Sequence, residues 1–156
     1  MANIYNLFKF LEKKRGTKTP LKVKFIYAPD ELTDEELNVE GLLDLDNSSL
    51  TSLPDGLRVG GHLYLSNSSI NSLPDNLKVG GDLFLPGTPI TSLPNNLKVG
   101  GGLYLSDTKI TSIPDNLQVG KFLSLRNTPL AKKYSEEEIR NMILDTGGYV
   151  KRNIYA

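Results

Sequence analysis

Apolar residues recur along this chain with a period of twenty residues. Val59, Val79 and Val99 each begin a nearly identical copy, of which the first reads VGGHLYLSNSSINSLPDNLK, and Val119 begins a shorter one, VGKFLSLRNTPLA. A weaker copy, VEGLLDLDNSSLTSLPDGLR, begins at Val39. A fixed period of this length is typical of a solenoid, in which each repeat forms one coil that stacks on the previous one.

The pattern inside one copy indicates how the coil is built. Leucines at 63 and 65 alternate with residues of other types, the period of two expected for a strand with one buried face. The group Pro74-Asp75-Asn76 favours a change of chain direction, and Gly60-Gly61 permits a second sharp bend. We therefore predict about five coils with one short strand each, joined in a parallel β-sheet, and no helix between Val39 and Thr128.

A column of hydroxyl residues recurs with the same period. Because it falls between apolar positions, we expect the hydroxyls to satisfy backbone groups at a bend inside the coil. The column consists of Ser48, Ser68, Thr88, Thr108 and Thr128.

Non-repeating segments flank the solenoid, which divides the chain into an N-terminal cap at 1–38, repeats at 39–131 and a C-terminal cap and tail at 132–156. An open solenoid end exposes core and unpaired strand edges, so we expect both caps to close the stack.

The N-terminal cap begins with Ile4, Leu7, Phe8 and Leu11, spaced as on one face of an amphipathic helix. We expect a strand over Leu21–Tyr27. Thr33 and Glu36 then have the spacing of a capping box and predict a short helical turn.

In the C-terminal cap, Ser135 and Glu138 form a second capping box, which predicts a helix with an apolar face. Gly147-Gly148 is expected to end this helix. The last segment, Tyr149–Tyr155, is predicted to be a further strand.

The amino-acid composition excludes several classes of catalytic and metal site. The chain of 156 residues has no cysteine, and its only histidine is His62. Thiol nucleophiles and thiolate zinc sites are thereby excluded, and Ser-His-Asp triads and multi-histidine metal sites are disfavoured. No apolar stretch is long enough to span a membrane, and the N-terminus does not resemble a secretory signal. We expect a cytoplasmic protein that is not an enzyme, with no cofactor, no metal and no membrane partner.

Charge is distributed unevenly although the formal net charge is zero. Residues 1–29 contain seven basic residues against Glu12, a balance of +6, whereas residues 30–46 contain eight acidic and no basic residues. One interpretation is that the two segments lie close together and neutralise each other. The alternative is a basic site for nucleic acid or an acidic partner.

The string LFLPGTPITSLP at 83–94 resembles the short bacterial form of the leucine-rich repeat. It is similar to the repeats of secreted effectors from enteric pathogens, in which asparagine replaces the hydroxyl residue of the motif. The hydroxyl, the Val-Gly-Gly approach and the segment TPLAKKYSEEEIRNMI at 128–143 resemble small leucine-rich proteins encoded by tailed bacteriophages and their hosts. The resemblance implies protein binding, with the host cytoplasm as the location if the protein is phage-encoded. Some effector relatives carry a ubiquitin ligase with a catalytic cysteine, which this chain lacks.

The resemblance also implies that residues between the strand leucines lie on the outer face of the sheet. Tyr64, Phe84 and Tyr104 then form an aromatic ladder, because neighbouring strands lie about 4.8 Å apart. The ladder is either a docking surface or only a set of stabilising cross-strand pairs, and a third alternative is that the chain termini cover it. The candidate partner-binding residues are His62, Tyr64, Ser66, Asp82, Phe84, Tyr104, Ser124 and Arg126.

The hypothesis from the sequence is therefore a non-enzymatic leucine-rich-repeat module that binds a protein, with a bacterial host protein or defence protein as the expected partner. The alternative is a nucleic-acid-binding or nucleic-acid-directed inhibitor protein that uses the basic N-terminal segment. The first hypothesis places the site on the sheet, and the second places it in the N-terminal cap.

Overall fold

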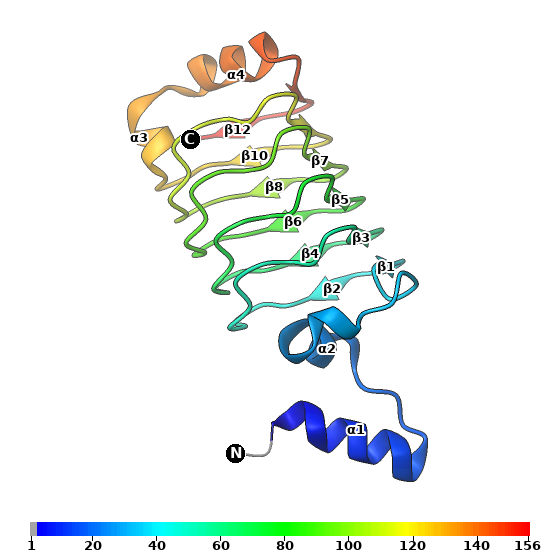
Figure 1. The fold of residues 1–156 in the computed structure, drawn as a ribbon. Coiled ribbons are helices and arrows are strands. Elements are labelled where there is room, and N and C mark those ends of the chain that lie inside the picture. The colour runs from blue at the N-terminus through cyan, green and yellow to red at the C-terminus, as the bar shows by residue number, and fades with distance from the viewer. Residues whose placement is uncertain (1–2) are drawn as a thin grey trace.

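A computed structural model describes residues 3–156 as an elongated leucine-rich-repeat-type solenoid with helices at both ends (Figure 1). Each coil contributes two strands of two residues. The first strands are β1 (Asn38–Val39), β3 (Arg58–Val59), β5 (Lys78–Val79), β7 (Lys98–Val99), β9 (Gln118–Val119) and β11 (Tyr149–Val150). The second strands are β2 (Leu43–Asp44), β4 (Leu63–Tyr64), β6 (Leu83–Phe84), β8 (Leu103–Tyr104), β10 (Leu123–Ser124) and β12 (Ile154–Tyr155).

These strands form two parallel sheets of six strands each, ordered β1-β3-β5-β7-β9-β11 and β2-β4-β6-β8-β10-β12. Within the repeats, each residue pairs with the residue twenty positions later, as Leu63 does with Leu83. The prediction of a parallel sheet is confirmed, and no helix occurs between Val39 and Thr128. The prediction of one strand per repeat is wrong, because a two-residue segment that ends in valine, such as Lys78–Val79, also forms a ladder before the bend of each coil.

The glycine pairs allow this second ladder. The Gly80 amide donates to the Val59 carbonyl at 2.8 Å, which continues the β3–β5 pairing into the bend. A Cβ on Gly80 would overlap the carbonyl oxygen of Gly60 in the coil before it. Glycine is therefore required here for close contact between coils.

The core lies between the two sheets, and the leucines of the repeat fill it from coil to coil. The hydroxyl column serves the role predicted for it: the Ser68, Thr88, Thr108 and Thr128 hydroxyls donate to the carbonyl three residues earlier at 2.6–2.8 Å. Ser48 is the exception, since its buried hydroxyl has no partner.

The N-terminal cap consists of α1 (Ile4–Arg15), α2 (Leu21–Tyr27) and the 3₁₀ turn η1 (Pro29–Glu31). The strand predicted over Leu21–Tyr27 is wrong. A helix satisfies its backbone hydrogen bonds internally and can therefore cover the open core without a partner strand. Its Phe25 is fully buried in the same cluster as the first coils.

A capping box, as predicted, begins the turn between η1 and β1. The Glu36 amide donates to the Thr33 hydroxyl at 3.2 Å, and the Glu36 carboxylate accepts from the Thr33 amide at 3.1 Å.

The C-terminal end contains α3 (Pro129–Lys133) and α4 (Glu136–Asp145), and α4 begins with the predicted Ser135–Glu138 capping box. Gly147 has a φ of 80° and follows the helix, as expected for the residue that ends it. The tail differs from the prediction, because 149–155 supplies two strands rather than one. Since β11 pairs with β9 and β12 with β10, the solenoid continues past 131 to Tyr155, with α3 and α4 inserted between coils.

Candidate functional site: an aromatic ladder on the sheet of even-numbered strands

The outer face of the sheet β2-β4-β6-β8-β10-β12 carries the predicted aromatic ladder. The rings of Tyr64 and Phe84 stack with centroids 4.8 Å apart and planes 5° from parallel. Phe84 and Tyr104 stack at 4.3 Å and 12°. All three side chains are half-buried, so each ring leaves an edge in solvent. The stacking follows from the register, which places the three residues on consecutive strands.

The ladder is longer than the sequence indicates. The Phe122 ring meets Tyr104 edge-on at 5.2 Å, and Tyr155 meets Phe122 at 6.1 Å. The Arg126 guanidinium lies 5.4 Å from the centroid of the Tyr155 ring. Phe122 occupies the space over Gly102, where a Cβ would contact its ring. We define the aromatic surface as Tyr64, Phe84, Tyr104, Phe122 and Tyr155.

Phe122 and Tyr155 are absent from the residues predicted to bind a partner. Phe122 has a position equivalent to His62 and Asp82, and Gly102 at the intervening position leaves the space for its ring. Tyr155 joins the ladder because β12 pairs with β10, a register that no repeat motif indicates.

Ser124 does not belong to the surface, contrary to the prediction. Its side chain is only 8% exposed, and its hydroxyl lies 3.0 Å from that of Ser106. Ser124 is therefore too buried to contact a partner directly.

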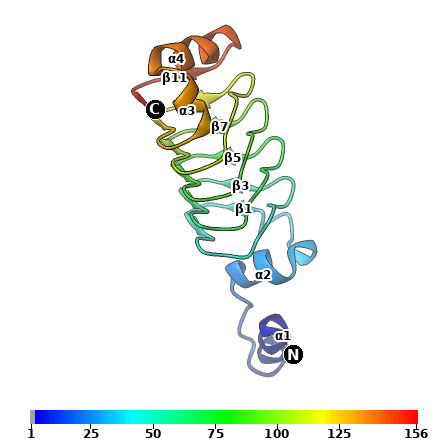
Figure 2. The ribbon, with the colours of Figure 1, turned by 90° about the vertical axis from the view of Figure 1, so that its left-hand side faces the viewer.

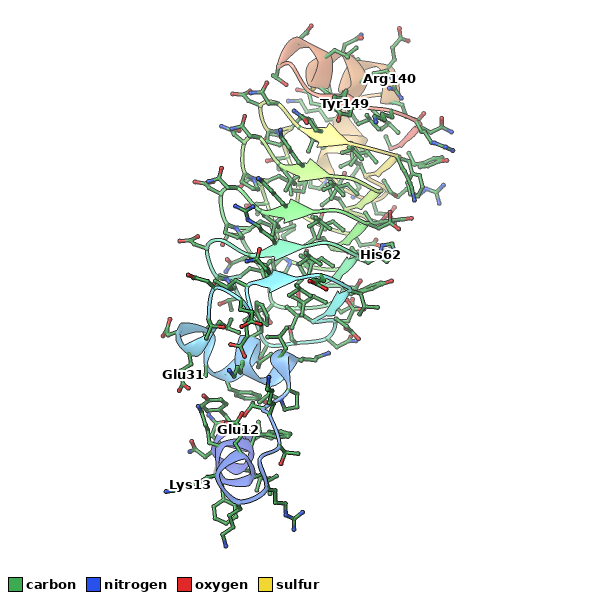
Figure 3. All side chains as sticks on the ribbon, turned by 90° about the vertical axis from the view of Figure 1, so that its right-hand side faces the viewer. Glu12, Lys13, Glu31, His62, Arg140 and Tyr149 are labelled. Atoms are coloured by element: carbon green, nitrogen blue, oxygen red, sulfur yellow. The ribbon has the colours of Figure 1, made fainter. Side chains whose placement is uncertain are left out.

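His62 and Asp82 connect coils through backbone contacts. The Asp82 amide donates to His62 Nδ1 at 2.9 Å, and the Gly102 amide donates to Asp82 Oδ1 at 2.7 Å. These side chains thus satisfy amides that face the preceding coil, and both remain half-buried at the rim of the ladder (Figure 3 labels His62). Ser66 also lies at this rim, where its amide donates to Asp46 Oδ1 at 2.6 Å.

The stacking determines which parts of the rings in the aromatic surface are available to contact a partner. Tyr64, Phe84 and Tyr104 turn their faces toward one another, so Phe84 has no free face for a nucleobase or a sugar ring. What they present is a row of ring edges together with two phenol hydroxyls. Burial raises the pKa of the Tyr104 phenol, and the Asp82 carboxylate adds to the rise. The tyrosine therefore remains a neutral hydrogen-bond donor at physiological pH.

Within residues 3–156, the segments at the two ends of the chain do not cover this surface. The segment that contains α1 lies beyond α2, at the opposite end of the molecule from α4 (Figure 1 and Figure 2). The C-terminal segment joins the sheet as β12 and lengthens the aromatic surface instead of folding over it.

The basic N-terminal segment is partly neutralised by the acidic segment that follows it. Lys24 pairs with Glu36 at 2.6 Å, Lys9 with Glu31 at 3.0 Å, and Lys22 with Asp44 at 3.6 Å. This confirms the proximity of the two charged segments and leaves fewer free cations for the alternative nucleic-acid site.

The described part of the chain offers neither a metal cluster nor a helix that could span a membrane. Among residues 3–156, no group of three or more His, Asp and Glu side chains could hold a metal ion. Within the same range, no helix has the length and apolar character needed to cross a bilayer.

Comparisons with known proteins give no match: no family model, no curated protein and no solved structure is similar to the chain.

Proposed function

We propose that the protein is a non-enzymatic binding module that docks a protein partner on the aromatic surface and its polar rim. The observation that supports this is the continuous row of half-exposed rings over consecutive strands. Large aromatic side chains dominate protein interfaces because they bury much area at low entropic cost.

The chemistry of the surface favours a protein over a nucleic acid. Ring edges and phenol hydroxyls suit apolar side chains and backbone carbonyls of a partner, whereas base stacking needs free ring faces. Arg126 and Asp82 at the rim supply charges of both signs, which suits a partner with mixed polar groups. The resemblance to small phage leucine-rich proteins suggests a bacterial host or defence protein as the partner, in the host cytoplasm.

Affinity capture from bacterial lysate tests the proposal, with the intact chain, a Phe84→Ser variant and a Lys98→Ser control on the opposite sheet. We expect the same protein to be captured by the intact chain and by the control, with and without nuclease, and to be lost with Phe84→Ser. Loss of the captured protein on nuclease treatment, or equal capture by all three chains, would contradict the proposal.

A further inference from the structure

The helix α1 is attached to the rest of the molecule through polar contacts of Tyr5, Lys9 and Glu12. Tyr5 is only 7% exposed, and its hydroxyl donates to the Glu31 carboxylate, which also pairs with Lys9 at 3.0 Å. Glu12, one turn further along, accepts from the Thr19 amide at 2.6 Å. The side of the helix that faces the solenoid is therefore held by hydrogen bonds and ion pairs.

Part of the apolar surface of α1 points outward: of the predicted face, Phe8 and Leu11 are half-buried, whereas Ile4 and Leu7 are exposed, so the helix does not close the stack as expected. Ile4, Leu7 and Phe10 follow each other at intervals of three residues and are 45%, 54% and 54% exposed. The core is closed instead by Phe25 of α2. Because α1 lies at the extreme end of the molecule, no other element shields this row (Figure 1 and Figure 2).

The exposed row ends in a cluster of cations. Lys13, Lys14 and Arg15 form the last turn of α1, and Lys18 follows the helix. None of the four takes part in an ion pair within the described residues 3–156. Lys14 lies against the apolar row, with its ammonium 5.0 Å from the centroid of the Phe10 ring. Figure 3 shows Lys13 at this end of the molecule.

The charges of α1 indicate what kind of partner its exposed face would bind. Glu12 is the only acidic residue of the helix and is already engaged with Thr19, so a second copy of α1 offers no anion to the cationic turn. A nucleic acid would satisfy the cations but leave the apolar row in water. A bilayer with anionic headgroups satisfies both, because apolar side chains enter the acyl boundary while lysine and arginine remain at the headgroups.

We propose that α1 is an interfacial helix that binds anionic lipid bilayers through Ile4, Leu7 and Phe10, with Lys13, Lys14 and Arg15 at the headgroups. The expectation of no membrane partner is based on the lack of a spanning segment, and a helix that lies in the interface needs none. The site is separate from the aromatic surface, so the two proposals can fail independently.

Co-sedimentation with vesicles tests the proposal. One set is phosphatidylcholine alone, and in the other about one third of the lipid is phosphatidylglycerol. We expect binding to the anionic set, weakened by added salt and reduced at least about tenfold in a Leu7→Gln/Phe10→Gln variant, because two apolar side chains no longer insert. A Leu42→Gln variant, which changes an exposed apolar residue of the solenoid, should bind as the intact chain does. Binding of the intact chain to neither set, or equal binding by all three chains, would overturn the proposal.

A single-tryptophan pair provides a second readout, since the chain has no tryptophan of its own. The fluorescence of Phe10→Trp should shift to shorter wavelength on anionic vesicles, and that of Leu42→Trp should not. Unchanged Phe10→Trp emission in sedimented protein would overturn the insertion of this row. Equal retention on vesicles after duplex DNA is added is also expected, whereas displacement by DNA would indicate a nucleic-acid site instead.

Discussion

The two ends of the solenoid are closed in different ways. At the C-terminus, β11 and β12 extend both sheets in register, and α4 packs on them with Ile139 and Ile143 buried. At the N-terminus, the single helix α2 covers the core, and the next helix outward, α1, is held by polar contacts.

This difference between the two ends shows that an amphipathic pattern identifies an apolar face but does not indicate what that face contacts. The apolar face of α4 is buried, and Arg140 secures the tail by donating to the carbonyls of Val150 and Arg152 at 3.1 and 2.7 Å. On α1, Ile4, Leu7 and Phe10 are exposed although the helix is amphipathic. We therefore regard the C-terminal cap as part of the folding unit and α1 as an attached module.

The largest expected effect is at the N-terminal closure. Phe25→Ala should cost about 3–5 kcal/mol of unfolding free energy, because it removes a fully buried ring and leaves a cavity under the first coil. Phe10→Ala, the same change on the exposed face of α1, should lie within about 0.5 kcal/mol of the intact chain. Urea unfolding followed by circular dichroism measures both. Equal costs would show that α1 belongs to the core.

The C-terminal closure gives a slightly smaller effect. Ile154→Ala should cost about 2–5 kcal/mol, since Ile154 continues the buried leucine column through β12. Leu144→Ala, on the exposed side of α4, is the matched control and should change stability little. If Ile154→Ala unfolded like the control, β12 would not be part of the cooperative sheet.

The capping box of α4 should contribute less. Ser135→Ala removes the hydroxyl that accepts from the Glu138 amide at 3.3 Å, a change that typically costs about 0.5–2 kcal/mol. Glu137→Gln, beside it in the first turn, serves as a control without a cap contact. Thermal melting distinguishes them, and equal midpoints would argue against the cap.

The smallest effect is the acid sensitivity of α1. The hydrogen bond from Tyr5, together with that from Lys9, holds the pKa of Glu31 below its ordinary value. A pKa that is lower in the folded state stabilises docking above the unfolded value of about 4.3, and this contribution is lost as pH falls. The protection factors of α1 amides, which correct for the intrinsic pH dependence of exchange, should therefore fall in acid before those of the coils. In Glu31→Gln these protection factors should already be low at neutral pH and should not show this step.

Much of the fold can be predicted from the sequence because the same pattern of apolar and polar residues occurs in several copies. The buried leucines, the bend hydroxyls and the stacking of Tyr64, Phe84 and Tyr104 all follow from a period of twenty. The first-strand ladder was not predicted, because two residues before a glycine pair show no alternation. LKVKFIY alternates as a strand does, yet the need to cover an open core without a strand partner makes it a helix.

The parts that escape prediction depend on contacts between distant residues. The tail YVKRNIY shares few residues with the repeat, so its register with β9 and β10 cannot be inferred from its sequence. The position of Phe122 depends on the absence of a side chain at Gly102. The outward face of α1 depends on Tyr5 and Glu31, which are 26 residues apart.

If the aromatic surface binds a protein, substitutions at two neighbouring residues of β6 should separate the effect on binding from the effect on stability. Affinity for the captured partner and melting temperature are determined for Phe84→Ser and for Leu83→Ala. We expect Phe84→Ser to weaken binding by about 2 kcal/mol or more with a smaller effect on melting. Leu83→Ala should cost about 2–5 kcal/mol of stability and leave the affinity of the folded protein unchanged. A Phe84→Ser protein that melts early and binds normally when folded would contradict the claim and show the ladder to be structural.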